Sequence, residues 1–408
     1  MDKAILKFDY PTEKPSIIKV IGVGGGGGNA VTHMYHEGIK DVNFALCNTD
    51  AQALDISDVP IKLYLGTLGA GGKPEIARSA AEDKVKEIET LLNDGTKMVF
   101  ITAGMGGGTG TGAAPVIARI AKSMDILTVG IVTIPFLFER LPKIFQALEG
   151  VKQMEKNVDA LLIINNERLR EIYKDIGTTQ KEAFKKADNT LTEAAKSIAE
   201  IITTAPLPGD INLDFADVST ILKNGNVAII NSGIATGSNR LSVAIESALV
   251  SPLLNNSNIH NAKKILFNII SSSNAPLLVD EMDEIDNFMS NFSSNIEVIW
   301  GTATDESLDQ NIKVTVLATG FGKDNMEVRM PNGDILTPWP NNEESEKQEQ
   351  KRQMIKDYYG IDIDTEWGKI HSKPHIFALE ELDNDTFIEL VINNPAYNRD
   401  SRILTQTL

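Results

Sequence analysis

Three glycine-rich segments near the start of the chain have the composition of phosphate-binding loops. The first is Gly22-Val-Gly24-Gly-Gly-Gly-Gly28, the second runs from Gly104 to Gly112, and the third runs from Gly66 to Gly72. Each precedes a predicted helix, and the first two also follow a predicted strand. Glycine lets backbone N–H groups approach an anion closely at the amino terminus of a helix. Three such loops at one edge of a sheet favour a nucleoside triphosphate as the ligand.

The first loop, taken alone, is also compatible with a dinucleotide. It contains the spacing G-x-G-x-x-G, and Asp50 follows at the end of the next predicted strand, as in dinucleotide-binding folds. An NAD(P)-dependent oxidoreductase is therefore an alternative, but it leaves the other two loops unexplained. The chain has no G-x-x-x-x-G-K-[ST] loop. This excludes a Walker-type ATPase and leaves amides and hydroxyls to hold the phosphates.

The elements that must position these loops alternate between strand and helix along the first half of the chain. Apolar strands that alternate with helices imply a mostly parallel, Rossmann-like sheet that is covered on both faces. The predicted strands are Ile17–Val23, Val42–Asn48, Met98–Ala103, Leu127–Ile134 and Asp159–Ile164, and the predicted helices are Asn29–His36, Pro74–Leu92 and Ala113–Met124.

The second half of the chain predicts a long helix followed by a second, smaller α/β domain. Between Lys181 and Thr203 apolar residues recur at steps of three and four, which predicts one amphipathic helix that serves as a spine between the domains. The second domain contains a helix at Ser242–Leu249 and strands at Lys264–Ile270, Ile296–Thr302 and Lys313–Thr319.

Beyond Gly322 the apolar periodicity decays. The run Asn341–Arg352 is polar and of mixed charge, which predicts a flexible linker, with a solvated helix as the alternative. Apolar residues return between Thr386 and Leu408. A short apolar cluster at the end of a tether is typical of a docking peptide.

The composition excludes several classes of protein. The 408 residues are 42% hydrophobic and 23% charged, which indicates about two to three globular domains and argues against disorder throughout. The formal net charge of −17 disfavours broad electrostatic attraction to nucleic acid or to anionic lipid.

Cysteine usage and the amino terminus favour a reducing cytoplasm. Cys47 is the single cysteine, so it forms no intramolecular disulfide, and its apolar neighbours predict a buried thiol. The start Met1-Asp2-Lys3 lacks a sustained apolar segment, so no secretory signal is expected. The longest apolar stretch, Ile126–Phe138, contains Pro135 and is too short to span a bilayer, so we expect no direct membrane insertion.

Several motifs together resemble the tubulin/FtsZ family of GTPases. The resemblance covers roughly residues 15 to 322. The motifs that carry it are Ile21-Gly-Val-Gly-Gly-Gly-Gly-Gly-Asn29-Ala30, Asn48-Thr49-Asp50-Ala51-Gln52-Ala53-Leu54, Gly106-Gly-Gly-Thr-Gly-Thr-Gly112, Asn212-Leu-Asp214-Phe-Ala-Asp217-Val218, Asn231-Ser-Gly-Ile-Ala-Thr-Gly237, Ser251-Pro-Leu-Leu254 and Val314-Thr-Val-Leu-Ala-Thr-Gly320.

The resemblance implies a GTPase that polymerises head to tail into protofilaments of the bacterial cytokinetic ring, in the cytoplasm at midcell. It divides the chain into a GTP-binding domain (1–178), a central helix (179–204), a carboxy-terminal GTPase-activating domain (205–322), a variable linker (323–385) and a partner-docking peptide (386–408). A non-hydrolysing or regulatory paralogue that forms a structural polymer is the alternative within the family.

By the same resemblance, the catalytic residues are Asn212, Asp214 and Asp217. They reach the γ-phosphate on the neighbouring subunit, where the two aspartates orient or polarise the attacking water and Mg²⁺ offsets phosphate charge. Carboxylates near a bound triphosphate would repel it, so their delivery on assembly couples hydrolysis to polymerisation. The alternative role is helix capping, because Asn and Asp favour helix starts.

The resemblance also implies which residues bind GTP or GDP. The departures from the family pattern are Arg140 in place of a glycine, Lys143 in place of an arginine, and Asp188-Asn189 in place of Asn-Asp. Lysine keeps the charge but loses the bidentate geometry. Phe184 stacks on the base or, alternatively, belongs to the helix core. The implied set is Gly25, Gly26, Gly27, Asn29, Asn48, Ala70, Gly71, Gly72, Gly104, Gly106, Gly107, Gly108, Thr109, Gly110, Thr111, Glu139, Lys143, Asn166, Phe184, Asp188 and Asn189.

The carboxy terminus carries a second recognition element. The segment Ile392-Asn-Asn-Pro395-Ala396-Tyr397-Asn-Arg399 resembles the family's recognition peptide, which binds membrane tethers and regulators of division. A disordered tail without a partner is the alternative. The implied partners are therefore other copies of the chain and these division proteins, with no nucleic acid.

Overall fold

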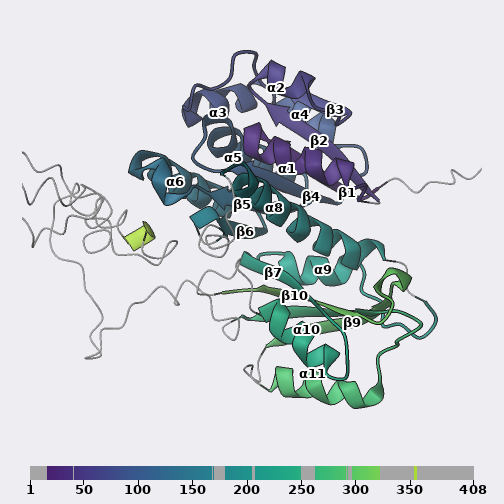
Figure 1. The fold of residues 1–408 in the computed structure, drawn as a ribbon. Coiled ribbons are helices and arrows are strands. Elements are labelled where there is room, and N and C mark those ends of the chain that lie inside the picture. The colour runs from purple at the N-terminus through teal and green to yellow at the C-terminus, as the bar shows by residue number, and fades with distance from the viewer. Residues whose placement is uncertain are drawn as a thin grey trace, which may run out of the picture. The chain divides into compact units, whose positions relative to one another are not determined.

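The computed structural model describes residues 16–39, 41–167, 169, 180–204, 207–249, 262–290, 292, 296–321 and 353–355. It divides into two compact units, residues 1–336 and 337–408. Of the second unit only 353–355 are described, so the predicted docking peptide and nearly all of the predicted linker lie outside the described residues. The following description concerns the first unit (Figure 1).

The amino-terminal half contains a parallel sheet in the strand order β3-β2-β1-β4-β5-β6. This is the order of a doubly wound nucleotide-binding fold, so the predicted Rossmann-like sheet is confirmed. The strands are β1 (Ile18–Val23), β2 (Val42–Asn48), β3 (Ile61–Tyr64), β4 (Met98–Gly104), β5 (Leu127–Ile134) and β6 (Ala160–Asn165). Strand β3 was not predicted, since it is short and none of its residues is buried.

Two sets of helices cover this sheet. Helix α1 packs against α8, while α5 packs against α3 and α6. The helices are α1 (Gly24–His36), α2 (Ala51–Asp55), α3 (Pro74–Glu82), α4 (Val85–Leu92), α5 (Gly108–Ser123), α6 (Leu141–Asn157) and α8 (Gln180–Thr203).

Several helices differ from the predicted ones. Helices α1 and α5 begin inside the glycine runs and not after them, because glycines there permit close packing on β4. A Cβ atom on Gly27, for example, would lie 2.8 Å from the Thr102 carbonyl carbon. The helix predicted from Pro74 to Leu92 is two helices, α3 and α4, with turn residues between them. Helix α6, which has a proline in its first turn, was not predicted.

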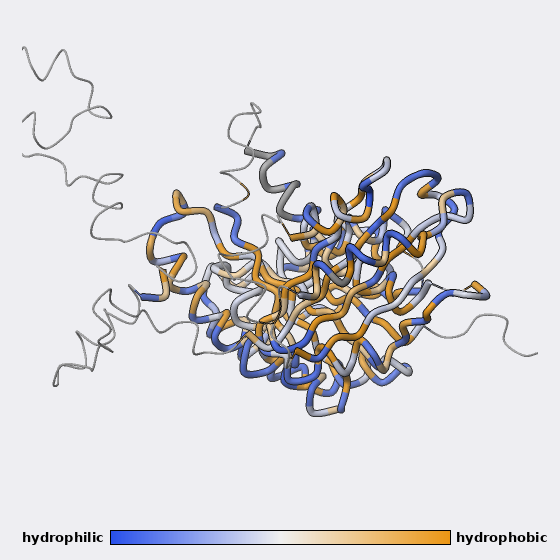
Figure 2. The backbone as a smooth tube through the Cα atoms, turned by 90° about the horizontal axis from the view of Figure 1, so that it is seen from below, coloured by the Kyte–Doolittle hydropathy of each residue, from blue (hydrophilic) through white to orange (hydrophobic). Residues whose placement is uncertain are grey.

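Helix α8 connects the two halves, as predicted for the long central helix. It contacts α1 and β5 in the first half, and α9 (Phe215–Leu222) and β7 (Asn226–Ala235) in the second. One hydrophobic cluster contains buried residues from both halves, including Val20, Ile198 and Ile221. Figure 2 shows apolar residues gathered in the interior of the first unit and hydrophilic ones around it.

The second half extends the same sheet, which has ten strands among the described residues. Strand β7 pairs in parallel with the start of β6, at Ala160–Asn226 and Leu161–Val227. Strand β10 (Ile312–Thr319) is antiparallel to β7 and to β8 (Lys264–Ser271), and β9 (Glu297–Thr304) is parallel to β8 and forms the far edge. Helices α10 (Arg240–Leu249) and α11 (Met282–Met289) cover this part, which confirms a second α/β domain.

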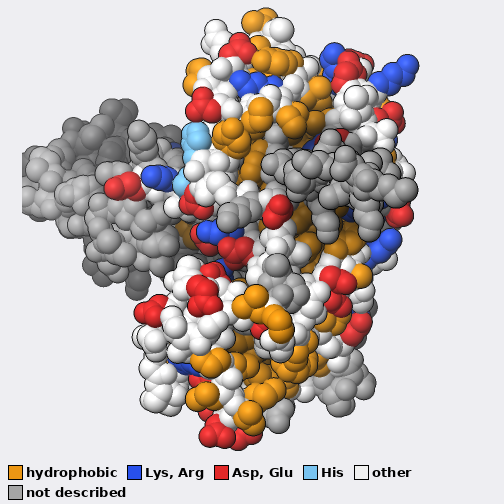
Figure 3. Space-filling model, turned by 90° about the vertical axis from the view of Figure 1, so that its right-hand side faces the viewer, with side chains coloured by type: hydrophobic (Ala, Val, Ile, Leu, Met, Phe, Trp, Pro, Cys, Tyr) orange, Lys and Arg blue, Asp and Glu red, His pale blue; other side chains and the backbone are white. Residues whose placement is uncertain are grey.

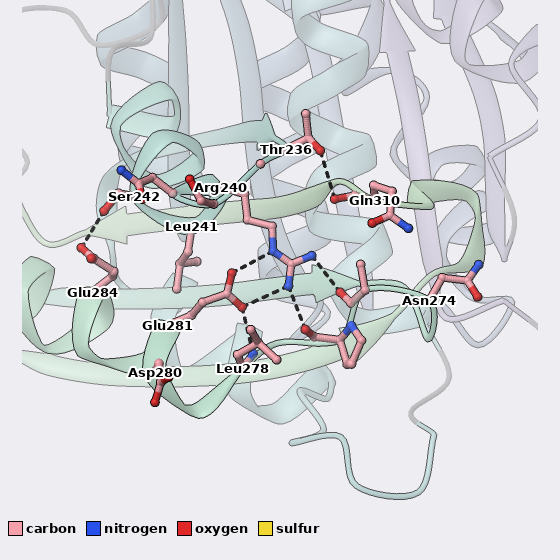
Figure 4. A pocket seen from close by; sticks show the side chains of 15 residues that line it. Thr236, Arg240, Leu241, Ser242, Asn274, Leu278, Asp280, Glu281, Glu284 and Gln310 are labelled. Carbon is pink, nitrogen blue, oxygen red and sulfur yellow. Dashed lines mark hydrogen bonds and ion pairs between the residues drawn. The ribbon is translucent and has the colours of Figure 1, made fainter.

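A largely buried ion pair between Arg240 and Glu281 holds residues 275–281 of this second domain in place. The Arg240 guanidinium binds both carboxylate oxygens of Glu281, at 2.8 and 3.0 Å, and donates to the carbonyls of Ala275 and Pro276. Glu281 also accepts from the backbone N–H of Leu278 at 2.8 Å. These bonds lie at a cavity of about 700 Å³ (Figure 4). The pair therefore fastens residues 275–281 to the start of α10.

The thiol of Cys47 is buried in β2, as predicted. Burial raises the pKa of this thiol to about 12, so it stays protonated at neutral pH. None of the helices in the described part of the chain combines the length and the apolar character that a bilayer crossing requires.

Candidate nucleotide-binding site

The first two glycine loops meet at the carboxyl ends of β1 and β4. A Cβ atom on Gly24 would lie 3.0 Å from the Gly110 nitrogen and 3.1 Å from the Thr109 Cβ, and one on Gly26 would lie 3.4 Å from the Gly104 Cα. Gly24 also has a φ of +73°, a backbone conformation that favours glycine. The amino termini of α1 and α5 are therefore packed side by side, as a phosphate cradle requires.

The third loop packs against the second. A Cβ on Gly108 would lie 2.8 Å from the Ala70 Cβ and 3.1 Å from the Gly72 carbonyl carbon. The Gln146 amide of α6 donates to the Gly72 carbonyl at 3.1 Å and to the Gly106 carbonyl at 3.0 Å. Sequence reasoning missed Gln146 because it missed α6. The structure thus brings all three predicted loops together, with Gln146 as a tie between two of them.

The two threonines of the second loop make contacts within the protein. The Thr109 hydroxyl shares a hydrogen bond of 2.7 Å with the hydroxyl of Thr49, a buried residue of the Asn48-Thr49-Asp50 motif. The Thr111 hydroxyl accepts from the Gly106 N–H at 2.9 Å and is buried. Thr111 therefore stabilises the loop from within, and Thr109 joins it to the end of β2.

The amino end of α1 opens onto a cavity of about 330 Å³. A Cβ on Gly25 or Gly28 would meet no atom within 4 Å in the described part of the chain. The partial positive charge of a helix amino terminus attracts an anion at such an opening. Predicted and unpredicted residues both line the cavity: Gly25, Asn29 and Asn48 belong to the predicted set, whereas Thr32, His33, His36 and Ser57 were not predicted.

Glu139 and Lys143 pair with each other in this structure. The Glu139 carboxylate accepts from the Phe136 N–H at 2.9 Å and from the Lys143 ammonium. Glu139 ends the short 3₁₀ helix η1 (Leu137–Glu139), and Lys143 lies four residues later in the first turn of α6. The role of Lys143 as a phosphate ligand therefore stays a prediction, since its ammonium is paired with Glu139 in this structure. Lys143 also approaches the second loop, where a Cβ on Gly106 would lie 3.1 Å from both the Lys143 Cγ and the Lys143 carbonyl oxygen.

Arg140, which stands where the family pattern has glycine, has a strained backbone. Its φ of 76° and ψ of 155° lie in a region that is almost exclusive to glycine. We expect Arg140→Gly to stabilise the fold by about 1 kcal/mol, since strain of this kind costs about 1–3 kcal/mol and glycine loses part of that gain to backbone entropy. Urea unfolding of both proteins measures the difference.

The matched control for Arg140→Gly is Arg78→Gly in the interior of α3, where the arginine side chain is exposed. That change should destabilise by about 1 kcal/mol, the ordinary cost of glycine in a helix. Destabilisation by both substitutions would show that Arg140 carries no strain.

Two buried acceptor oxygens lie at the predicted base-binding end. Asn166 is only 6% exposed, and its Oδ1, like that of Asn189, has no hydrogen-bond partner among the described residues. An unsatisfied buried acceptor costs about 1–3 kcal/mol, so these oxygens suit a ligand with N–H donors, such as the guanine edge. Burial raises the pKa of the Asp188 carboxyl to about 7. The side chain of Phe184 lies outside the described residues.

The predicted catalytic residues lie in the second half, around the start of α9. The Asp214 carboxylate accepts from the N–H groups of Ala216, at 2.7 Å, and Asp217, at 3.2 Å, while the Asp217 carboxylate accepts from the Asp214 N–H at 2.9 Å. Both carboxylates therefore cap α9, which was the alternative role. Asn212 and Asp214 are exposed. Among the described residues, no hydrogen bond or ion pair joins this acidic segment, Asn212–Asp217, to the glycine loops.

Comparison with known proteins identifies the family to which this chain belongs. The model of the Tubulin/FtsZ family, GTPase domain, matches residues 17–174, and that of the FtsZ family, C-terminal domain, matches residues 226–322. The chain is 50% identical, over 418 aligned residues, to cell division protein FtsZ of Porphyromonas gingivalis (strain ATCC BAA-308 / W83), an alignment that covers 100% of this chain and 90% of that protein. The chain belongs to the FtsZ family.

Other FtsZ proteins agree with this assignment. Cell division protein FtsZ of Buchnera aphidicola subsp. Baizongia pistaciae (strain Bp) is 45% identical over 313 residues, which cover 75% of this chain and 80% of that protein. The solved structure of an empty FtsZ dimer from M. jannaschii superposes with a TM-score of 0.68 at 35% identity, covering 81% of this chain and 96% of that one. The family is one of tubulin-like GTPases, so the glycine loops are confirmed as part of a GTPase domain that binds GTP and GDP. The oxidoreductase alternative has no remaining support.

Proposed function

We propose that this chain hydrolyses GTP in a site that two subunits complete, one with its glycine loops and the next with its acidic segment. The observation that carries this proposal is the separation of the two parts. The phosphate cradle is built entirely in the first half of the chain, and the carboxylates of the acidic segment make their hydrogen bonds within the second. Two such different patches on each copy assemble head to tail into an open filament.

The first subunit binds the nucleotide chiefly through backbone amides at the amino ends of α1 and α5. Asn166 and Asn189 receive the N–H edge of guanine with their buried oxygens. The side-chain oxygens of Asn48, Thr49 and Thr109 suit Mg²⁺, which prefers oxygen ligands and combines few protein ligands with substrate phosphates. When bound, this cation neutralises part of the phosphate charge.

The second subunit contributes the carboxylates of Asp214 and Asp217. Each uses one oxygen to cap α9, and the other oxygen has no partner among the described residues. That oxygen can accept a hydrogen bond from the attacking water and orient it. Because capping fixes each carboxylate on the helix, little side-chain freedom has to be lost when the subunits meet.

In the cell, the filament belongs to the cytokinetic ring at midcell. We propose the division of the chain into a GTP-binding domain (1–178), a central helix (179–204), an activating domain (205–322), a linker (323–385) and a docking peptide (386–408). The docking peptide would recruit membrane tethers and regulators of division. These assignments rest on family membership.

The proposal is tested by following phosphate release against protein concentration with GTP and Mg²⁺, together with sedimentation. We expect almost no turnover below a threshold concentration, and a rate per subunit that rises at least about tenfold above it, where filaments sediment, because an isolated subunit lacks the water-orienting group. A rate per subunit that does not depend on concentration would contradict the shared site. Filaments without phosphate release would favour the non-hydrolysing alternative.

A further inference from the structure

The backbone before the acidic segment is attached to the edge strand of the sheet. The N–H of Thr302 in β9 donates to the Ile211 carbonyl at 2.9 Å, and the Ile211 N–H donates to the Thr302 hydroxyl, also at 2.9 Å. Strand β9 pairs with β8 along its other edge. The residues before the acidic segment therefore cover an edge that would otherwise present unpaired backbone groups.

Strand β9 also packs against Leu213, which is the buried residue among residues 212–214 of the acidic segment. Leu213 is 6% exposed and joins the hydrophobic cluster shared by both halves, whereas its neighbours Asn212 and Asp214 are exposed. A Cβ on Gly301 would lie 2.6 Å from the Ile211 carbonyl oxygen and 2.9 Å from a Leu213 methyl carbon. Only glycine at position 301 leaves room for this approach. Burial of Leu213 thus turns the residues on either side outward.

A third contact fixes the turn that leads into the segment. The Thr304 hydroxyl donates to the Asp210 carboxylate at 3.2 Å, and the other oxygen of that carboxylate accepts from the Leu207 N–H at 2.8 Å. The turn is closed by a hydrogen bond of 3.0 Å from the Asp210 N–H to the Leu207 carbonyl. The chain is therefore held by β9 at residues 210, 211 and 213, and by the cap of α9 at residues 214 and 217.

We propose that strand β9, through Gly301, Thr302 and Thr304, is the positioning element of the acidic segment. This inference rests on the proposed function, in which Asp214 and Asp217 must reach the nucleotide of the next subunit. None of the three β9 residues touches substrate in this proposal. They act by holding Leu213 and Ile211, and with them the direction in which the two carboxylates project. A displacement of about 1 Å at a catalytic group is enough to lower a rate strongly.

The decisive substitution is Thr302→Val, which keeps the shape of the side chain but removes the oxygen that accepts from Ile211. We expect kcat per subunit, measured above the assembly threshold, to fall about tenfold, while the KM for GTP and the threshold concentration stay within about twofold. Thr302→Ser retains the hydroxyl and should restore kcat to within about twofold of the parent.

The matched control is Thr315→Val. Thr315 is a buried threonine of β10 whose hydroxyl bonds to Ser232, and it makes no hydrogen bond to residues 207–217 among the described residues. It should leave kcat within about twofold. If Thr302→Val does not fold, Thr304→Val replaces it, with a smaller expected fall in kcat because it removes the longer hydrogen bond.

Two outcomes separate this inference from the proposed function. A normal kcat in Thr302→Val or Thr304→Val, combined with lost hydrolysis in Asp214→Asn, would overturn the role of β9 alone. Normal hydrolysis in Asp214→Asn would overturn the proposed function. A Thr302→Val protein whose loss of rate is fully explained by a higher assembly threshold would also overturn the positioning role.

Discussion

Replacing Asp214 with asparagine should lower GTP hydrolysis per subunit by a factor of about 10² or more, with GTP affinity within about twofold of the parent. Asparagine caps a helix as well as aspartate does, so α9 keeps its start and only the charge that polarises water is lost. Phosphate release above the assembly threshold measures the rate, and equilibrium binding of labelled GTP measures the affinity.

The control for this substitution is Asp305→Asn. Asp305 is also an exposed aspartate of the second domain that caps a helical turn, with its carboxylate 2.9 Å from the Ser307 N–H. It should leave hydrolysis within about twofold. Loss of GTP binding in Asp214→Asn would place Asp214 in the nucleotide-binding part of the same subunit and contradict a site shared between subunits.

Removal of the Glu281 carboxylate should cost about 3 kcal/mol of folding stability, the second large effect expected. Glu281→Ala leaves the Arg240 guanidinium buried without its anion, and breaking a buried pair from one side costs about 3–5 kcal/mol. We take the lower end because Arg240 retains the carbonyls of Ala275 and Pro276. Urea unfolding at pH 7 measures the loss. The control is Glu87→Ala, which removes one partner of the exposed Lys84–Glu87 ion pair and should not shift the unfolding midpoint measurably.

The same ion pair predicts a pH dependence of stability. The hydrogen bond from Arg240 lowers the pKa of Glu281 below its ordinary value and outweighs the opposing effect of burial. A group whose pKa is lower in the folded state stabilises the fold above its unfolded pKa, and this contribution is lost as the pH falls through the folded pKa. The stability difference between the parent and Glu281→Ala should therefore shrink when unfolding is repeated below about pH 4. An unchanged difference would contradict the ion pair.

Much of the nucleotide-binding half could be predicted from the sequence because its signals are local. Apolar strands such as Val42–Asn48 and Leu127–Ile134 have the predicted bounds, since a strand buried on both faces is a continuous apolar run. The glycine runs were recognised because their signal, too, is local in the sequence. Their helices begin earlier than predicted because low helix propensity at Gly24 and Gly108 is overridden by packing of the glycines against neighbouring loops.

Contacts between residues far apart in the sequence were beyond local patterns. No spacing rule connects Gln146 with Gly72, or Thr302 with Ile211 across 91 residues. Which apolar side chains are exposed could not be predicted from the sequence either. Residues such as Leu68 and Val279 have the same type as core residues but lie on the surface. Figure 3 shows one face on which hydrophobic side chains gather in both the upper and the lower part of the molecule.

By itself, the sequence determined the class of chemistry: glycine loops that can hold a triphosphate and an Asn-x-Asp-x-x-Asp segment that can orient water. The tertiary structure alone decided how these groups are held, with three loops packed into one cradle, Lys143 turned to Glu139, and the acidic segment docked on β9. The physical reason is that residue type and spacing report short-range backbone preferences and burial. The direction of a side chain depends on partners that only the folded chain brings within hydrogen-bond distance.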